Sequence, residues 1–241
     1  MANLKTSAGV TDHKVVSHEE WLAARKAFLI KEKEFTKLRD QLTQQRRDLP
    51  WEKVDKNYMF DTPNGQESLA DLFAGKNQLI VYHFMFAPEA TQGCSSCSFW
   101  ADNFDSIIIH LKQRDVTMLA ISLAPLEKLE AFKKRMGWSF KWVSSGNTDF
   151  NYDYHASFRP EDIANGTAEY NYTQSPGNHP NREGVSVFYK DDNDDIYHTY
   201  SAYARGIDLV NTAYNYLDLV PKGRDEQSNL NWVRFHDKYP D

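Results

Sequence analysis

The sequence predicts an α/β domain in which parallel strands alternate with helices. The most apolar run of the chain, residues 79–86, is bounded by Asn77 and Pro88 and has the composition of a buried strand. Two helices and two further strands follow it in alternation, at 97–114, 116–123, 125–138 and 140–143. This β-α-β-α-β order predicts a parallel sheet with right-handed crossovers.

Residues 1–50 form an N-terminal extension dominated by one long amphipathic helix. Ser17 and Glu20 have the spacing of a capping box, and the helical pattern continues to about Arg47. Apolar side chains recur every seven residues along it, at Trp21, Phe28, Phe35 and Leu42. We expect this seam to pack against the chain's own domain, as most apolar stripes do. The alternative is a homodimer in which the seam pairs with a second copy.

The main domain is expected to span residues 51–220. It opens with an edge hairpin, whose turn contains Pro63, Asn64 and Gly65, followed by a short helix before the central strand. A second hairpin, with strands at 185–190 and 196–200, and a helix over 207–219 close the domain.

Two segments fall outside this alternating pattern. The segment at about residues 146–184 is too long for a plain connector, which indicates an insertion. Its aromatic side chains either cover the core, which we prefer, or wall the cysteine site. The C-terminal tail, residues 221–241, is polar except for a few apolar side chains, so we expect it to dock on the domain. These are Leu230, Trp232, Val233, Phe235 and Tyr239.

The only two cysteines, Cys94 and Cys97, form a C-x-x-C motif where the loop after the first buried strand becomes a helix. The first N–H groups of a helix lack internal partners, and the helix dipole places partial positive charge there. A thiolate is stabilised at such a position, which lowers the thiol pKa. Cys94, nearer the open end, is therefore expected to be the nucleophile. Cys97, one turn later, is expected to resolve a mixed disulfide.

Two other interpretations of the cysteine pair remain open. Zinc in a structural site needs four ligands, and no second C-x-x-C or paired-histidine motif accompanies Cys94 and Cys97. Free cysteines are also among the most buried residues, so the pair could be inert core. We expect redox chemistry with neither a metal nor a bound cofactor, because C-x-x-C beside a β-α-β pattern is a redox signature.

Longer strings around these elements resemble a family of predicted thioredoxin-like dithiol-disulfide oxidoreductases of unknown function. They are Leu-Ile-Val-Tyr-His-Phe-Met-Phe at 79–86, Gly-Cys-x-x-Cys-Ser-Phe-Trp-Ala-Asp at 93–102 and Leu-Glu-Ala-Phe-Lys-x-x-Met-Gly-Trp at 129–138. The similarity continues at 142–145, 149–153 and 198–208, so it covers most of the chain. It implies a thioredoxin-like fold, with a central mixed sheet flanked by helices, and dithiol-disulfide chemistry.

The resemblance also suggests roles for two further residues. Thr91 stands three residues before Cys94, as in the T-x-x-C of peroxiredoxins, where the threonine assists a cysteine that attacks peroxide. The proline of that motif is displaced here, because Pro88 precedes Thr91 by three residues and not four. His83 lies close to where thioredoxins carry a buried acid that moves a proton to or from the second cysteine. A core histidine held by a backbone carbonyl is the interpretation of His83 that we prefer.

A third position departs from thioredoxin itself. Thioredoxins place a cis-proline beside the cysteines, just before the first strand of the later hairpin, where it helps to seat the substrate backbone. Glu183 and Gly184 occupy that place here. This departure argues against general reduction of protein disulfides.

Composition excludes several classes of partner. A net charge of −6 and a pI near 5.8 argue against binding to nucleic acid or to anionic membranes. No apolar run is long enough to span a bilayer, and the first residues lack the apolar core of a secretory signal. We therefore expect a cytoplasmic protein, whose dithiol is kept largely reduced.

The sequence thus predicts a thiol-disulfide oxidoreductase. Its substrate would be a disulfide-containing protein or a small-molecule thiol compound, and an external thiol reductant would regenerate the cysteine pair. One alternative is a peroxidase with Cys94 as the peroxidatic cysteine and Thr91 assisting. The other is a non-catalytic binding or scaffold domain whose long helix dimerises.

Overall fold

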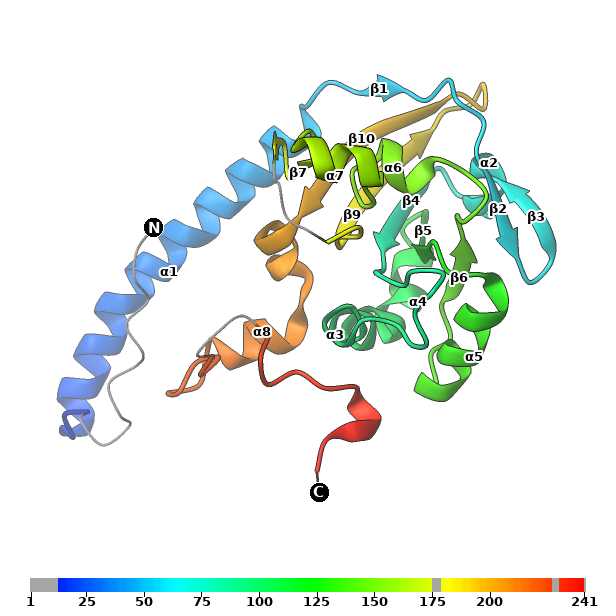
Figure 1. Cartoon of the computed structure of the whole chain (residues 1–241). Helices are drawn as coiled ribbons and strands as arrows, with labels where there is room; N and C mark the ends of the chain where they lie inside the picture. Colours follow the sequence, from blue (N-terminus) through cyan, green and yellow to red (C-terminus); the bar gives the residue numbers. More distant parts are fainter. Residues whose placement is uncertain (1–12, 175–178, 227–229, 241) are drawn as a thin grey trace.

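The computed structural model describes residues 13–174, 179–226 and 230–240, and parts of the predicted extension, insertion and tail lie outside them. Its centre is a sheet of eight strands in the order β1-β10-β9-β4-β5-β6-β2-β3 (Figure 1). The strands are β1 (Glu52–Lys53), β2 (Met59–Thr62), β3 (Gly65–Ser68), β4 (Gln78–His83), β5 (Val116–Ser122), β6 (Lys141–Ser144), β9 (Gly184–Lys190) and β10 (Ile196–Tyr203). A separate hairpin contains β7 (Glu169–Tyr170) and β8 (Thr173–Gln174).

The middle of the sheet is parallel and its sides are antiparallel. β5 pairs in parallel with both β4 and β6, whereas β9 and β2 join this group in the antiparallel sense. The crossovers contain α3 (Ser95–Phe104), a short 3₁₀ turn, α4 (Ile108–Lys112) and α5 (Leu126–Met136). The two crossovers, from β4 to β5 and from β5 to β6, have the same handedness and progress in the same direction across the sheet, so their helices lie on the same face. In agreement with this, α3 and α5 share one core. The predicted α/β class and the β-α-β-α-β unit are confirmed.

Each face of the sheet has its own apolar core. Tyr82 and Phe84 of the β4 region face α3 and α5. Leu79 and Val81 face the opposite side, which α2 (Leu69–Leu72) and α6 (Phe150–Asp153) cover. Alternation along β4 therefore decides which of its side chains can reach the cysteines. The insertion, which also contains α7 (Pro160–Asn165), contributes Phe150 and Tyr154 to the core away from the cysteines. Its Tyr170 instead lies against the loop at Glu183, near Cys97.

Two predicted helices are interrupted. The helix expected over 97–114 begins earlier, at Ser95, and is broken at Asp105, whose carboxylate accepts hydrogen bonds from the N–H groups of Ser139 and Phe140. The helix expected over 207–219 is a 3₁₀ segment (Ala204–Val210) followed by α8 (Thr212–Leu217). Asn211 separates them because its side chain caps α8, accepting from the Tyr214 N–H at 3.0 Å.

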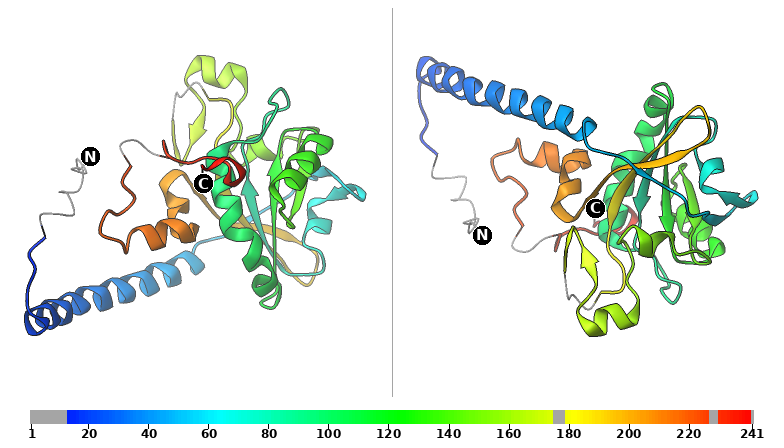
Figure 2. Two further views of the ribbon diagram at one scale, coloured as in Figure 1. Left: turned by 90° about the horizontal axis from the view of Figure 1, so that it is seen from below. Right: turned by 90° about the horizontal axis from the view of Figure 1, so that it is seen from above.

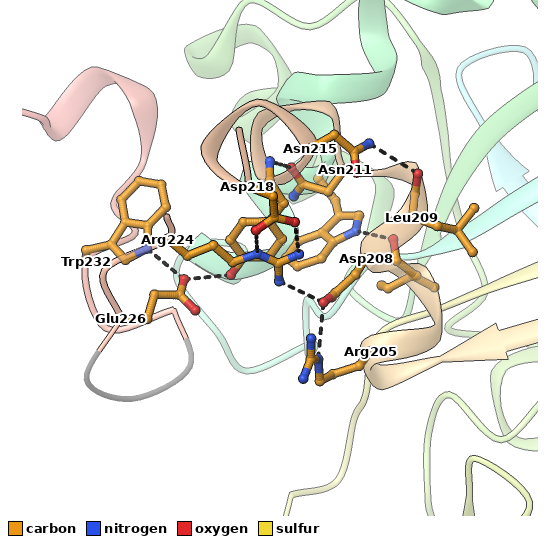
Figure 3. A network of polar contacts seen from close by, with 12 residues as sticks. Arg205, Asp208, Leu209, Asn211, Asn215, Asp218, Arg224, Glu226 and Trp232 are labelled. Atoms are coloured by element: carbon orange, nitrogen blue, oxygen red, sulfur yellow. Dashed lines mark hydrogen bonds and ion pairs between the residues drawn. The ribbon is translucent and has the colours of Figure 1, made fainter. Parts of the chain in front are cut away.

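A polar network fixes this closing segment (Figure 3). The Arg224 guanidinium donates to both carboxylate oxygens of Asp218 at 2.9 Å and to Asp208 at 2.9 Å. It also lies over the Tyr214 ring, 3.9 Å from its centroid. The Tyr214 hydroxyl and the Trp232 indole N–H both donate to Glu226, which links α8 to the tail.

The long helix α1 (His18–Arg47) begins with the predicted capping box, in which Ser17 and Glu20 exchange hydrogen bonds of 3.2 Å. It extends away from the sheet (Figures 1 and 2), and none of its residues is buried. The exposed fractions of its heptad side chains are 54% for Trp21, 56% for Phe28, 65% for Phe35 and 53% for Leu42. The expectation that this seam packs on its own domain is wrong. Contact with the domain is near the C-terminal end of α1, where Arg46 lies over the Tyr200 ring.

The tail docks against α3 and α5. Val233 and Phe235 are buried, and the Phe235 ring lies 5.5 Å from that of Phe132 on α5. Asp237 receives two 2.9 Å hydrogen bonds from Arg135. The tail therefore reaches the helices that surround the cysteines. Across the described residues, no helix combines the length and apolar character needed to cross a membrane.

Candidate active site

The cysteine pair lies at the end of β4, where the sequence predicted it. Cys94 is the N-cap of α3 and is partly exposed, whereas Cys97, in the first turn, is 1% exposed. The backbone of Met85 holds both residues. The Cys94 N–H donates to the Met85 carbonyl at 3.1 Å, and the Met85 N–H donates to the Cys97 Sγ at 3.4 Å. Both thiols are free.

Gly93 allows the loop before Cys94 to approach the core closely. A Cβ at this position would lie 2.7 Å from the Phe84 ring and 3.1 Å from the Phe132 ring. Since real Cβ atoms do not approach so closely, any larger residue would push the loop, and Cys94 with it, away from the sheet. The glycine is therefore part of what positions the exposed thiol.

The environment of Cys94 favours its thiolate. The Cys97 side chain, as a hydrogen-bond donor, and the N–H groups of Cys97 and Ser96 lower the pKa of Cys94 to about 7, although burial opposes them. No side chain caps α3, so its first N–H groups are available to this sulfur. A thiol with this pKa is about half ionised at pH 7, whereas a free cysteine is about 3% ionised.

Cys97 has the opposite character. Burial, followed by the neighbouring Cys94, raises the pKa of Cys97 well above its ordinary value. Only one of the two sulfurs is thus both reachable and ionised near neutral pH. This asymmetry fits a nucleophile beside a second cysteine that reacts later.

Sequence reasoning missed Tyr82, and it placed Glu183 beside the cysteines without foreseeing the effect of its carboxylate. Tyr82 is 1% exposed, and within the described chain its hydroxyl has no hydrogen-bond partner. Burial, and then the nearby Cys97 and Glu183, raise the pKa of Tyr82 well above its ordinary value. The Glu183 carboxylate also acts to raise the pKa of both thiols. Alternation along residues 82, 84 and 86 was the signal that could have identified Tyr82.

His83 does not reach the cysteines. Its ring stacks on Phe150, with 5.7 Å between centroids, on the opposite face of the sheet. Its Nε2 lies 2.9 Å from the Ser186 Oγ, which begins a hydrogen-bonded chain through Ser201 to His198. The proton-transfer role suggested for His83 therefore does not fit, because adjacent side chains of a strand point to opposite faces. The structure matches the preferred interpretation of a core histidine, but its partner is the Ser186 hydroxyl and not a backbone carbonyl. Burial lowers the pKa of His83 to about 4.

Thr91 lies on the loop before Cys94 and is exposed. The hydrogen bonds of the described residues include none between its hydroxyl and Cys94. The arrangement in which a threonine supports a peroxidatic sulfur is thus not formed here.

The loop at Glu183 and Gly184 is trans, like every peptide bond of the described chain. The Glu183 carbonyl accepts from the Tyr170 hydroxyl at 2.9 Å, and that hydroxyl accepts from the Ala204 N–H at 2.9 Å. A Cβ on Gly184 would lie 2.5 Å from the Tyr203 ring. The backbone of this loop therefore already has partners within the protein itself.

For the residues described, no grouping of three or more histidine, cysteine or acidic side chains is suited to a metal ion.

Comparison with known proteins gives one family match and several similar structures. A family model described as "Bacterial protein of unknown function (DUF899)" matches residues 10–239. No curated protein matches the chain. A mutant of peroxiredoxin Q from Xanthomonas campestris is 13% identical, with a TM-score of 0.43, and the match covers 66% of this chain and 90% of that one.

Two further solved structures show comparable similarity. For the peroxidoxin BcpB from Mycobacterium tuberculosis, the identity is 11% and the TM-score 0.45, with 67% and 93% of the two chains covered. For a putative thiol:disulfide interchange protein DsbE from Chlorobium tepidum, the identity is 13% and the TM-score 0.37, and the match covers 63% of this chain and 86% of that one. The chain's own strand order β5-β4-β9-β10, with α3 following β4, agrees with the thioredoxin-like fold that the sequence resemblance implies. At these values, neither an activity nor a substrate transfers to this chain.

Proposed function

Since this chain belongs to the DUF899 family of bacterial proteins, whose description assigns no activity, we propose from its own residues that it is a thiol-disulfide oxidoreductase. Cys94 is the nucleophile and Cys97 the resolving cysteine. The observation that supports this most is the difference between the two thiols. The pKa of Cys94 is lowered to about 7, whereas the pKa of the buried Cys97 is raised.

The reaction requires only thiols and disulfides. The Cys94 thiolate attacks one sulfur of a substrate disulfide, the substrate S–S bond breaks, and the leaving thiolate takes a proton from solvent. Cys97 then loses its proton to solvent and attacks the Cys94 sulfur of the mixed disulfide. The bond from Cys94 to the substrate breaks, and the second substrate thiolate takes up a proton. The substrate gains two electrons and the cysteine pair becomes a disulfide. An external thiol reduces it again, which fits a reducing, cytoplasm-like compartment.

The test is the rate of alkylation of the reduced protein as a function of pH. Reaction requires the thiolate, so the rate at Cys94 should rise with pH, reach half its maximum near pH 7 and level off above about pH 8. Mass spectrometry of peptides should locate the label on Cys94, with Cys97 protected. Titration with glutathione redox buffers should then form an intramolecular disulfide reversibly. A midpoint near 8.5 with no such disulfide would refute the proposal.

The peroxidase alternative has less support, because Thr91 is exposed and is not hydrogen-bonded to Cys94.

The scaffold alternative depends on α1, whose apolar seam is exposed. We propose that this seam pairs with α1 of a second copy. A seven-residue apolar period suits a helical partner that coils around it, and not a flat domain surface. Lys31 and Glu32 lie on the two sides of the seam and allow opposite charges to meet across a two-fold axis.

Sedimentation equilibrium of the full chain at micromolar concentration should therefore show a dimer. Substituting Phe28→Glu together with Phe35→Glu should give a monomer, because four carboxylates would enter the dimer seam. Ile30→Glu is the matched control, since Ile30 is 61% exposed on the opposite side of the helix. A wild-type monomer, or equal dissociation by the control substitution, would contradict pairing through this seam.

A further inference from the structure

A groove of about 680 Å³ opens beside Cys94, on the side of Gly93 and Ser95. Its remaining walls are Gln92, Arg135 of α5 and tail residues between 233 and 238. The groove thus exists because the tail docks on α3 and α5. Gly93 and Ser95, the two chain neighbours of the residue proposed to attack the substrate, form one of its walls.

The groove is basic although the protein is acidic. Arg135, Arg234 and Lys238 line it. The carboxylate of Asp237 neutralises Arg135, to which it is bound by two hydrogen bonds of 2.9 Å. Arg234 donates only to the backbone carbonyls of Asn231 and Val233, and no ion pair of the described residues includes Arg234 or Lys238. Two cationic groups therefore remain without an acidic partner in the described structure.

These two charges contrast with the rest of the site and of the chain. The net charge of the chain is −6, and the Glu183 carboxylate lies near both thiols. An anionic molecule would be repelled by this background unless a local positive field guided it. Arg234 and Lys238 supply such a field.

We propose that this groove binds the anionic group of a small-molecule disulfide, most simply a carboxylate, and holds its sulfur against Cys94. This inference rests on the proposed function and adds the class of substrate. Carboxylates are recognised by arginine through paired N–H donors. The bound anion would place one disulfide sulfur beside the Cys94 thiolate, and the leaving thiol would depart with its proton as described above.

Two observations favour a small molecule over a protein. The volume of the groove lies in the range of small-molecule sites, about 300–1,000 Å³. The backbone at Glu183 and Gly184, where a peptide would be seated in a thioredoxin, is closed. Tyr170 occupies the Glu183 carbonyl, and the Tyr203 ring covers Gly184.

The test compares three small disulfides that differ in charge: dithiodipropionate, which is a dianion, hydroxyethyl disulfide, which is neutral, and cystamine, which is a dication. The second-order rate constant of reduced protein with each is measured by stopped flow at low and high salt. Wild-type protein should react fastest with the dianion. The double variant Arg234→Gln/Lys238→Gln should react about 10-fold more slowly with the dianion, and the rate constant should lose most of its dependence on salt. Its rate with the neutral disulfide should change by less than about twofold.

Lys112→Gln/Lys134→Gln is the matched control, because it removes two exposed lysines of α4 and α5 that do not line the groove. It should keep the preference for the dianion. If both double variants lost the same share of the rate with the dianion, only the net charge of the protein would matter. The proposal that the groove binds an anion would then be refuted. If all three disulfides reacted rapidly and at similar rates, the proposed anion site would be refuted, whereas the proposed oxidoreductase activity would be retained. No reaction of Cys94 beyond that of a free thiol would overturn both.

Discussion

Substituting Cys97→Ser is expected to stop the reaction halfway. Cys94 would still attack a disulfide, but the mixed disulfide could not be resolved within the protein, so it should accumulate. With a chromogenic disulfide, the variant should release one equivalent of thiol, whereas reduced wild-type protein should release two. Intact-mass spectrometry should show the adduct on the variant. Turnover with an excess of external thiol should fall steeply, because release then depends on a bimolecular step.

Cys94→Ser is expected to abolish even the first step, since the remaining Cys97 thiol is buried and its pKa is raised. Ser96→Ala serves as the control, because it changes a side chain between the cysteines and leaves both sulfurs. The roles assigned here would be reversed if Cys94→Ser formed the adduct and Cys97→Ser did not. Comparable adducts on both variants would show that the two thiols are equivalent.

Acid is expected to destabilise the fold through His83. The pKa of this buried imidazole is about 4 in the folded protein, against 6.5 for an ordinary histidine. Between these values the unfolded chain binds a proton that the native protein excludes. The free energy of unfolding should therefore fall as the pH drops from about 6.5 to about 4, by about 3 kcal/mol from this group. His198, whose pKa burial also lowers, acts in the same direction.

Urea unfolding followed by circular dichroism at several pH values between 7.5 and 4 measures this loss. His83→Gln should be less stable at neutral pH, because it disturbs the hydrogen bond to Ser186 and the contact with Phe150. Its stability should nevertheless depend much less on pH in this range. His110→Gln, at an exposed position of α4, should keep the wild-type dependence. An unchanged slope in His83→Gln would show that other groups govern the acid transition.

Local signals predicted the elements that hold the cysteines. The capping box of Ser17 and Glu20, the apolar run before Cys94 and the turn at Asn64 and Gly65 each act over a few residues, and each is found in the structure. The position of the cysteines at the start of a helix also follows from neighbouring residues alone. Such features depend on backbone chemistry within one or two turns, so a single sequence specifies them.

Features that depend on distant segments were not predictable in this way. Tail residues such as Arg234 lie beside Ser95 only because Val233 and Phe235 find a place against α3 and α5. The face on which His83 lies could not be predicted, because a strand buried on both faces has no polar side to fix its register. The free seam of α1 was misjudged for a related reason, since an apolar stripe does not say which surface covers it.

The distribution of tryptophans has a practical consequence for experiments on this protein. Four of the six, Trp100, Trp138, Trp142 and Trp232, belong to or pack against the core that contains Cys97. Trp21 and Trp51 are about half exposed and lie outside that core. Disulfides quench indole emission by electron transfer over short distances. We therefore expect the short-wavelength part of the emission spectrum to report the oxidation state of the cysteine pair without any attached dye.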